Sequence, residues 1–332
     1  MRLNLKPIRD QTIVITGASS GIGLATARQA AEAGARVFLV SRNEAALARI
    51  CHDLTARGYE AAFAVADVGD AAALRAAAQQ AIARFDGFDA WVNIAGVAIY
   101  AKLLDTPIQE HARLFRTNYW GVVNGAAAAI PHLKKYGGAF ITIGSVASDI
   151  GTPILGAYAA SKHAVKGFID SLRIELIAER APVSVTLIKP SGIASPLPEH
   201  AANHFDCAVK SPPPTYAPEL VADVILHAVT HQRREITVGG VGFLQIIGAA
   251  HTPHLMDRIS AAFIPLMKDT SRRREAKNNL FEAGFSGEVR SRFQSSRRVS
   301  LYTTGTLHSF VVAGLGALAL GIALAAAARA RR

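Results

Sequence analysis

Few residues in this chain of 332 are suited to crosslink it or to hold a metal ion. The two cysteines, Cys51 and Cys207, cannot form a disulfide framework, and neither has the spacing of a metal-ligand pair. The 11 histidines are scattered without a paired motif, so we predict no metal site. Such sparse cysteine is typical of a protein in a reducing compartment.

Charged residues are also scarce, at 18% of the chain against 50% hydrophobic residues, which excludes a disordered or collagen-like protein. Near the amino terminus a long apolar run is missing. The basic residues Arg2, Lys6 and Arg9 precede an apolar stretch of only five residues, Thr12–Thr16. We therefore expect no signal peptide.

Acidic residues are scarce toward the carboxyl end. Residues 271–332 contain 11 Lys and Arg but only three Asp and Glu, so +8 of the net charge of +11 lies there. A nucleic-acid-binding tail would have this charge, but no zinc finger or aromatic-rich binding module accompanies it. We expect no nucleic-acid partner.

The stretch Thr306–Ala328 has no charged residue in 23 positions, and arginines follow it. As a helix it would span roughly 35 Å, enough to cross a hydrocarbon layer of about 30 Å. A buried core helix is the alternative, but the stretch follows a charged segment after a complete domain. We predict a single transmembrane helix over residues 306–328 that anchors the protein to membrane lipid.

Short apolar runs alternate with helical patterns over residues 1–240. Runs typical of buried strands cover residues 12–16, 37–40, 61–65, 90–93, 139–143, 183–188 and 235–238, and helical patterns cover 22–33, 44–57, 71–85, 157–179 and 219–230. Strands that alternate with helices predict a doubly wound α/β domain, with helices on both faces of a parallel sheet.

Three later segments depart from this alternation. Residues 194–218 contain six prolines, which argues against a regular helix and favours a substrate lid, with a disordered linker as the alternative. The apolar residues 242–264 favour a helical hairpin that packs on the domain or lies on a membrane. Residues 271–300 are polar and rich in arginine, and we expect a mobile linker. We place the extension and linker at residues 241–305.

A glycine-rich turn, Thr16–Gly23, follows the first strand and opens the first helix. Gly17 allows a tight turn, Gly21 lets a pyrophosphate approach the backbone, and Gly23 permits close packing of helix and strand. The first N–H groups of the helix then face the phosphates. The alternative is an ordinary glycine-rich turn.

Arg42 follows the second strand, and no acidic residue lies between Val37 and Asn43. An acid there would bind the adenosine ribose, whereas an arginine pairs with a 2′-phosphate. This position favours NADP(H) over NAD(H), unless Arg42 is only a solvated surface charge.

Tyr158 and Lys162 are four residues apart on a predicted helix and so share one face, with Ser145 just past a predicted strand. A tyrosine with its ordinary pKa of about 10 is a poor base at neutral pH. A nearby ammonium would stabilise the phenolate and lower that pKa.

In this order, the motifs resemble those of the short-chain dehydrogenase/reductase family in its single-domain form, over residues 10–240. Thr16–Gly23 is similar to the family's TGxxxGxG turn. The resemblance also includes Asp67-Val68 as an adenine contact, Asn93-Ile94-Ala95-Gly96 as an NNAG element with Ile94 in place of asparagine, and a proline–glycine turn, Lys189–Ile193, with Ser191 inserted.

The resemblance implies a Rossmann fold, a dimer or tetramer, and specific roles for residues. Tyr158 would exchange the substrate proton, Lys162 would hold the nicotinamide ribose and lower the Tyr158 pKa, and Ser145 would orient the carbonyl. Asn118 would position a water next to Lys162. The implied cofactor-binding residues are Gly17, Ser19, Ser20, Gly21, Ile22, Gly23, Arg42, Asp67, Val68, Asn93, Ala95, Gly96, Tyr158, Lys162, Pro190, Gly192 and Ile193.

The sequence therefore predicts a membrane-anchored NADP-dependent oxidoreductase acting on a carbonyl or secondary alcohol. The region after residue 240 resembles the extension of membrane-attached relatives, and a nicotinamide cofactor favours a catalytic domain that faces the cytoplasm. An apolar, lipid-like substrate is suggested by the anchor and by Ile150, Ile154, Leu155 and Leu197. The alternative is a non-catalytic, membrane-attached nucleotide-binding or redox-sensing scaffold, which would not need Tyr158 and Lys162 together.

Overall fold

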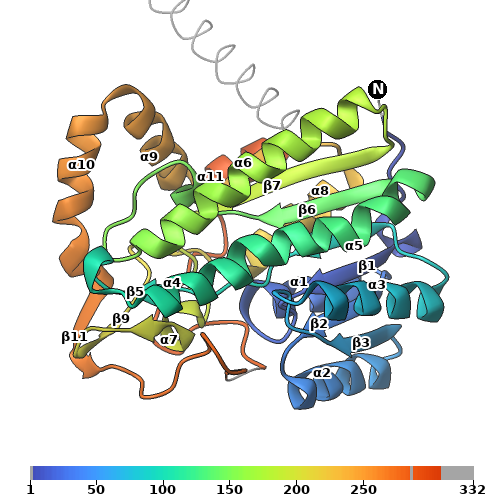
Figure 1. Ribbon diagram of the computed structural model, residues 1–332, viewed down its shortest axis with the longest axis horizontal. Helices are drawn as coiled ribbons and strands as arrows, with labels where there is room; N and C mark the ends of the chain where they lie inside the picture. The colour runs from blue at the N-terminus through green and yellow to red at the C-terminus, as the bar shows by residue number, and fades with distance from the viewer. Residues whose placement is uncertain (1–2, 285–286, 308–332) are drawn as a thin grey trace, which may run out of the picture.

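A sheet of seven parallel strands lies at the centre of the protein, in a computed structural model that describes residues 3–284 and 287–307 (Figure 1). The strand order is β10-β7-β6-β4-β1-β2-β3. All seven predicted strands are confirmed. Their bounds are β1 (Thr12–Thr16), β2 (Arg36–Ser41), β3 (Ala61–Val65), β4 (Ala90–Asn93), β6 (Gly138–Ile143), β7 (Val183–Pro190) and β10 (Glu235–Val238).

Helices cover both faces of this sheet, as the alternation predicts (Figure 1). One face packs against α1 (Gly21–Glu32), α2 (Glu44–Ala56) and α8 (Pro218–Thr230), and the other against α3 (Ala71–Phe85), α5 (Gly121–Tyr136) and α6 (Gly156–Ala178).

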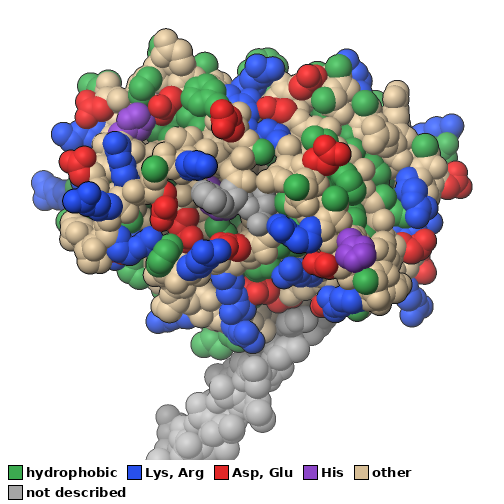
Figure 2. Space-filling model, turned by 90° about the horizontal axis from the view of Figure 1, so that it is seen from below, with side chains coloured by type: hydrophobic (Ala, Val, Ile, Leu, Met, Phe, Trp, Pro, Cys, Tyr) green, Lys and Arg blue, Asp and Glu red, His purple; other side chains and the backbone are tan. Residues whose placement is uncertain are grey.

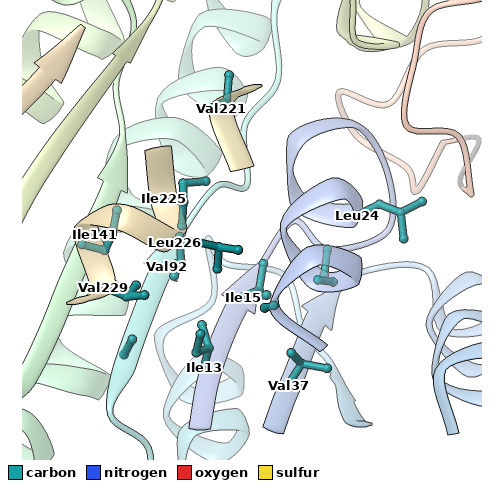
Figure 3. Packing of buried hydrophobic residues seen from close by; sticks show 14 of the residues in the cluster. Ile13, Ile15, Leu24, Val37, Val92, Ile141, Val221, Ile225, Leu226 and Val229 are labelled. Carbon is teal, nitrogen blue, oxygen red and sulfur yellow. The ribbon is translucent and has the colours of Figure 1, made fainter. Parts of the chain in front are cut away.

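Successive residues of a strand contribute to opposite cores because strand side chains alternate between faces. Ile13 and Ile15 of β1 are fully buried on the face of α1 and α8, in the same apolar cluster as Ile225 (Figure 3). Val14 is equally buried on the opposite face. Each such side chain contributes about 1.5–3 kcal/mol by leaving water, which explains why these strands are apolar throughout.

Residues 97–138 carry no predicted element, and the structure contains α4 (Ile108–Phe115), a π-helical turn η3 (Arg116–Trp120) and α5 there. Gly125 and Pro131 weaken the helical signal of α5. Gly125 is required by packing, because a Cβ at this position would lie 2.3 Å from Oδ1 of Asn93 on β4.

The proline-rich residues 194–218 contain only one turn of helix, α7 (Leu197–His200). Two short strands follow: β8 (Ala202–Asn203) pairs with β5 (Ile99–Tyr100), and β9 (Cys207–Val209) pairs with β11 (Lys268–Arg273). The disordered-linker alternative for this segment is therefore wrong.

Residues 240–262 form the predicted helical hairpin, as α9 (Gly240–His251) and α10 (Pro253–Ala262). The predicted mobile linker over residues 271–300 is wrong for the residues described there. Ser291 N–H donates to the carbonyl of Ala194, and Arg297 exchanges main-chain hydrogen bonds with Thr215 and Ala217. These residues are ordered because loops of the domain satisfy their backbone groups. The helix α11 (Leu301–Leu307) follows. The remaining short helices are η1 (Ile8–Asp10), η2 (Leu103–Asp105), η4 (Val146–Ser148) and η5 (Ile264–Met267).

Among residues 3–284 and 287–307, no helix has both the length and the apolar character needed to cross a membrane. The predicted transmembrane helix over Thr306–Ala328 lies outside the described residues except for its first two positions.

Candidate active site

The glycine-rich turn lies at the carboxyl ends of β1 and β4. The Thr16 hydroxyl accepts hydrogen bonds from the backbone N–H groups of Ile94 and Ala95, at 3.1 and 3.3 Å. Gly23 packs so closely against the turn that a Cβ there would lie 2.1 Å from the Gly17 carbonyl oxygen. This close packing directs the start of α1 at the cleft, where its N–H groups favour a phosphate.

A cavity extends from this turn toward the end of β2. Its lining brings together sequence-predicted residues from four segments, namely Gly17, Ser19, Ser20, Arg42, Asp67, Val68, Ala95 and Gly96. We assign this half of the cleft to the adenosine end of a dinucleotide, because it lies beside the ends of β1 and β2.

Arg42 is partly buried and does not behave as a solvated surface charge. Its Nη2 donates to the carbonyl of Asn279 at 2.6 Å, and its Nη1 donates to that of Phe281 at 3.2 Å. Burial and the nearby Arg113 lower the pKa of Arg42, but a guanidinium stays charged in proteins.

Asp67 balances part of this positive charge. Its carboxylate pairs with Arg113 at 2.7 Å and accepts a hydrogen bond from Gly69 N–H at 2.9 Å. Burial raises the pKa of Asp67, but the Gly69 hydrogen bond and the charge of Arg113 outweigh it and leave the pKa below its usual value. Two arginines facing one carboxylate leave the adenosine end with a net positive charge.

A second cavity continues past the start of α1 to the candidate catalytic side chains. It is lined by the predicted residues Ser20, Gly21, Ile22, Gly23, Gly96, Tyr158 and Lys162. Ser20, Gly96, His200 and Asn279 line both cavities, so the two are halves of one cleft. The described residues thus join the phosphate turn to Tyr158, the arrangement that a dinucleotide and a substrate require.

Tyr158 and Lys162 lie on α6, where Lys162 is buried and Tyr158 is half-buried. Lys162 Nζ donates to the carbonyl of Ile143 at 2.7 Å and lies 5.5 Å from the centroid of the Tyr158 ring. Burial raises the pKa of Tyr158 to about 12, and a hydrogen bond with Ser145 only partly offsets this. Burial also lowers the pKa of Lys162 to about 8. The predicted lowering of the Tyr158 pKa by Lys162 is therefore not found in this structure, because desolvation disfavours both charges.

Asn118 lies in the π-helical turn and is fully buried. Its side-chain amide donates to the Val97 carbonyl at 3.0 Å and accepts from Val97 N–H at 2.9 Å. Asn118 also donates to the Ser161 hydroxyl at 3.1 Å. This side chain fixes the loop after β4 against α6, and π-helical turns of this kind often occur at functional sites.

Four of the predicted cofactor-binding residues do not line either half of the cleft. The Asn93 side chain is bonded instead to Trp91 and Thr142. The others, Pro190, Gly192 and Ile193, lie at the end of β7 and just after it, where Gly192 and Ile193 pack on residues 211–216.

Several lining residues lie outside the predicted set. Ser195, Pro196 and His200 come from the proline-rich segment that is predicted to be a lid, as does Leu197, which is already expected beside an apolar substrate. Asn279, Ala283 and Gly284 come from the segment predicted to be a mobile linker. Their sequence carries no motif that would have indicated this position.

Known proteins are similar to this chain in sequence. The profile of a family described as short chain dehydrogenase matches residues 11–204. An uncharacterized oxidoreductase of Bacillus subtilis, YxnA, is 39% identical over 99% of this chain and 94% of its own. Dehydrogenase/reductase SDR family member 7B of Xenopus tropicalis is 31% identical over 70% of this chain and 79% of its own.

Two solved structures have the same fold. A short chain dehydrogenase/reductase from Burkholderia phymatum, in complex with NAD, is 26% identical, with a TM-score of 0.68 over 76% of this chain and 96% of that one. An alcohol dehydrogenase from Thermococcus sibiricus, complexed with 5-hydroxy-NADP, is 24% identical, with a TM-score of 0.61 over 69% of this chain and 95% of that one.

Proposed function

Because this chain belongs to the short-chain dehydrogenase family, we propose that it transfers hydride between NADP(H) and a carbonyl or secondary alcohol, with Tyr158 as general acid and base. The observation that carries the proposal is the continuity of the cleft. Its lining runs from Arg42 and the phosphate turn to Tyr158 and Lys162.

The residues of the cleft fit a dinucleotide. The positive end of the α1 dipole favours a pyrophosphate, although Gly21 N–H itself donates to the Glu288 carbonyl. Arg42 with Arg113 makes the adenosine end positive. A bound nicotinamide would supply or accept the hydride. At neutral pH the high pKa of Tyr158 keeps its phenol protonated, so it is ready to donate that proton to the oxygen of a carbonyl substrate.

Ser145 and Lys162 assist this proton transfer in the proposed mechanism. The Ser145 hydroxyl, which lowers the Tyr158 pKa by its proximity, would orient the substrate oxygen. The Lys162 ammonium, beside the Tyr158 ring, would favour the phenolate that remains after the proton has left. Asn118 holds the loop at Val97, which lines the adenosine half of the cleft.

The preference for NADP(H) is supported by Arg42 and by the absence of an acidic residue in β2 or directly after it. An acid at the end of β2 would bind the 2′-hydroxyl of NAD(H), whereas an arginine binds a 2′-phosphate. The Burkholderia phymatum relative was solved with NAD, so both nucleotides belong in the test.

An apolar substrate is supported by the side chains around Tyr158. Tyr158 packs with Leu155, Leu197 and Val209 in a small apolar cluster that is separate from the sheet. This cluster would contact the part of the substrate beyond the reacting carbon. Long-chain or polycyclic carbonyl compounds are therefore the substrates to test first.

Attachment to a membrane and self-association complete the proposal. The uncharged stretch Thr306–Ala328 in the sequence supports a membrane anchor. A catalytic domain that uses NADP(H) would face the cytoplasm. Support for a dimer or tetramer is family membership alone. In cells, the full chain is expected in the membrane fraction after washing at alkaline pH, and recovery in the wash would refute the anchor.

The decisive experiment is NADPH oxidation by the full chain in detergent against a panel of apolar and polar carbonyl compounds. We expect turnover on at least one apolar member and a loss of about 1000-fold or more in Tyr158→Phe, with NADPH binding nearly unchanged. Tyr136→Phe is the matched control, because Tyr136 is 65% exposed at the far end of α5.

Turnover that survives in Tyr158→Phe would refute the catalytic role of Tyr158. Binding of NADPH without turnover on any substrate class would favour the non-catalytic scaffold. Turnover on small sugars that equals or exceeds turnover on long-chain or polycyclic carbonyl compounds would refute the proposal of an apolar substrate.

A further inference from the structure

Residues 278–284 of the C-terminal extension lie across the adenosine end of the cleft. Arginines from two other elements bind three consecutive carbonyls of this segment. Arg42 donates to the carbonyls of Asn279 and Phe281. Arg113 of α4 donates to the carbonyl of Leu280 at 2.8 Å. The segment is thus fixed directly over the charges that would face a nucleotide.

Leu280 anchors this segment in the domain. It is 1% exposed and packs with Val97, Leu114 and Tyr158 in an apolar cluster. Asn279 N–H donates to the His200 carbonyl at 2.8 Å, and Asn43 donates through its side chain to the Gly284 carbonyl at 3.2 Å. A buried leucine and bonded main-chain groups are features of a fixed structural element rather than of a linker.

The chain returns to the phosphate turn a few residues later. Gly287 N–H donates to the Ser19 carbonyl, and Gly21 N–H donates to the Glu288 carbonyl, each at 2.8 Å. These bonds attach the extension to the turn itself.

Figure 2 shows the face of the protein seen from below Figure 1, with Lys and Arg side chains interspersed among acids.

The side chain of Asn279 has a further property. Asn279 lines both halves of the cleft, together with Ser20 and Gly96 of the phosphate-binding region. Its Oδ1 atom is buried, yet among the described residues no donor reaches it. A buried amide oxygen without a donor is costly, and in a binding cleft it indicates a ligand that supplies one.

We propose that residues 278–284 and 287–288 are the outer wall of the dinucleotide site, and that Asn279 binds the cofactor there. This inference rests on the proposed function. Ribose hydroxyl groups are donors that a dinucleotide carries between its adenine and its nicotinamide, where the two halves of the cleft meet. The C-terminal extension would then complete a site that the matched family region, residues 11–204, leaves open.

The test uses the full chain in detergent and the dissociation constant for NADPH, followed by nucleotide fluorescence. Asn279→Ala is expected to raise that constant about tenfold, because one hydrogen bond to the cofactor is lost. Asn279→Asp is expected to raise it less than Asn279→Ala does, because a carboxylate still accepts a hydrogen bond from a ribose hydroxyl.

Asn278→Asp is the matched control. Asn278 is exposed, lines neither half of the cleft, and accepts a hydrogen bond from Leu280 N–H through Oδ1, which an aspartate retains. We expect a dissociation constant within about twofold of the parent. The melting temperature of Asn279→Ala without nucleotide is expected to match the parent, whereas a purely structural role would lower it.

A second measurement follows the wall itself. Phe281 is 56% exposed, and chymotryptic cleavage after it is expected to slow when NADPH is bound, while cleavage after Tyr136 is unchanged. Equal rates of cleavage after Phe281 with and without NADPH would contradict the proposal that this segment forms the outer wall of the dinucleotide site.

Unchanged NADPH affinity in Asn279→Ala would overturn the role of Asn279 and leave the proposed function intact. Tighter binding in that variant would also overturn it, because the segment would then compete with the nucleotide. A parent protein that binds neither NADPH nor NADH would overturn the proposed function and this inference together.

Discussion

The Lys162 ammonium lies 5.5 Å from the centroid of the Tyr158 ring, one helical turn away on α6. Lys162 is buried and Tyr158 is half-buried. Desolvation moves both pKa values toward the neutral form, to about 12 for Tyr158 and about 8 for Lys162. Without cofactor the pair is therefore a protonated phenol beside an amine that loses its proton within an accessible pH range.

The pH dependence of the two directions of reaction should differ. Alcohol oxidation needs the Tyr158 phenolate, and since the Tyr158 pKa is raised by burial, its rate should increase with pH between 6 and 9, by up to about tenfold per pH unit. Carbonyl reduction needs the phenol and should not increase over this range. Steady-state rates in both directions check this, and an oxidation rate independent of pH would contradict it.

Lys162→Met should remove activity but not stability. The Lys162 pKa is about 8 in the folded protein, below its unfolded value, so the buried ammonium disfavours folding at pH 7. Removing the buried ammonium stabilises the folded protein, and losing its hydrogen bond to the Ile143 carbonyl offsets part of this gain. We expect the free energy of unfolding to rise by about 1–2 kcal/mol. In the parent, stability should rise with pH above 8, because the unfolded chain then binds more protons.

Urea denaturation at pH 7 measures this, together with oxidation rates that should fall about 100-fold or more. Lys166→Met is the control, since Lys166 lies one turn further along α6, pairs with Asp170 and does not line the cleft. A Lys162→Met variant that is much less stable than the parent would show that the amine is mainly structural.

Arg42→Ser should change the choice of cofactor. Loss of a charge-assisted contact with the 2′-phosphate should raise the dissociation constant for NADPH by about 10- to 100-fold. The constant for NADH should change less, although Arg42 also holds the Asn279 carbonyl. Arg57→Ala, at the exposed end of α2, serves as control. An equal rise in the dissociation constants for NADPH and NADH would mean that Arg42 only fixes the outer wall and does not bind the 2′-phosphate.

Gly23→Ala should disrupt the phosphate turn. The added Cβ would lie 2.1 Å from the Gly17 carbonyl oxygen, so the backbone must shift. We expect a loss of about 1–3 kcal/mol in stability and loss of measurable NADPH binding. Gly167→Ala is the matched control, because a Cβ on this exposed face of α6 meets nothing within 4 Å. Calorimetry with and without NADPH distinguishes the two variants.

The sequence by itself determined the alternation of strands and helices, the phosphate turn, and the placing of Tyr158 and Lys162 on one helix face. Each of these is a local pattern. The period of a strand or helix fixes which neighbouring side chains share a face, and a turn needs its glycines within a few residues. The seven strands and about half of the cleft lining could be predicted for that reason.

Only the tertiary structure decided where the C-terminal extension lies and what Arg42 contacts. Arg42 and Asn279 are 237 residues apart, and the hydrogen bond that joins them uses a main-chain carbonyl. Every residue carries such a carbonyl, so the partner leaves no trace in the identity of the side chain at position 279. The same holds for Gly21 and Glu288. Contacts between backbone groups far apart in the chain depend on how the whole domain folds, and no local pattern encodes them.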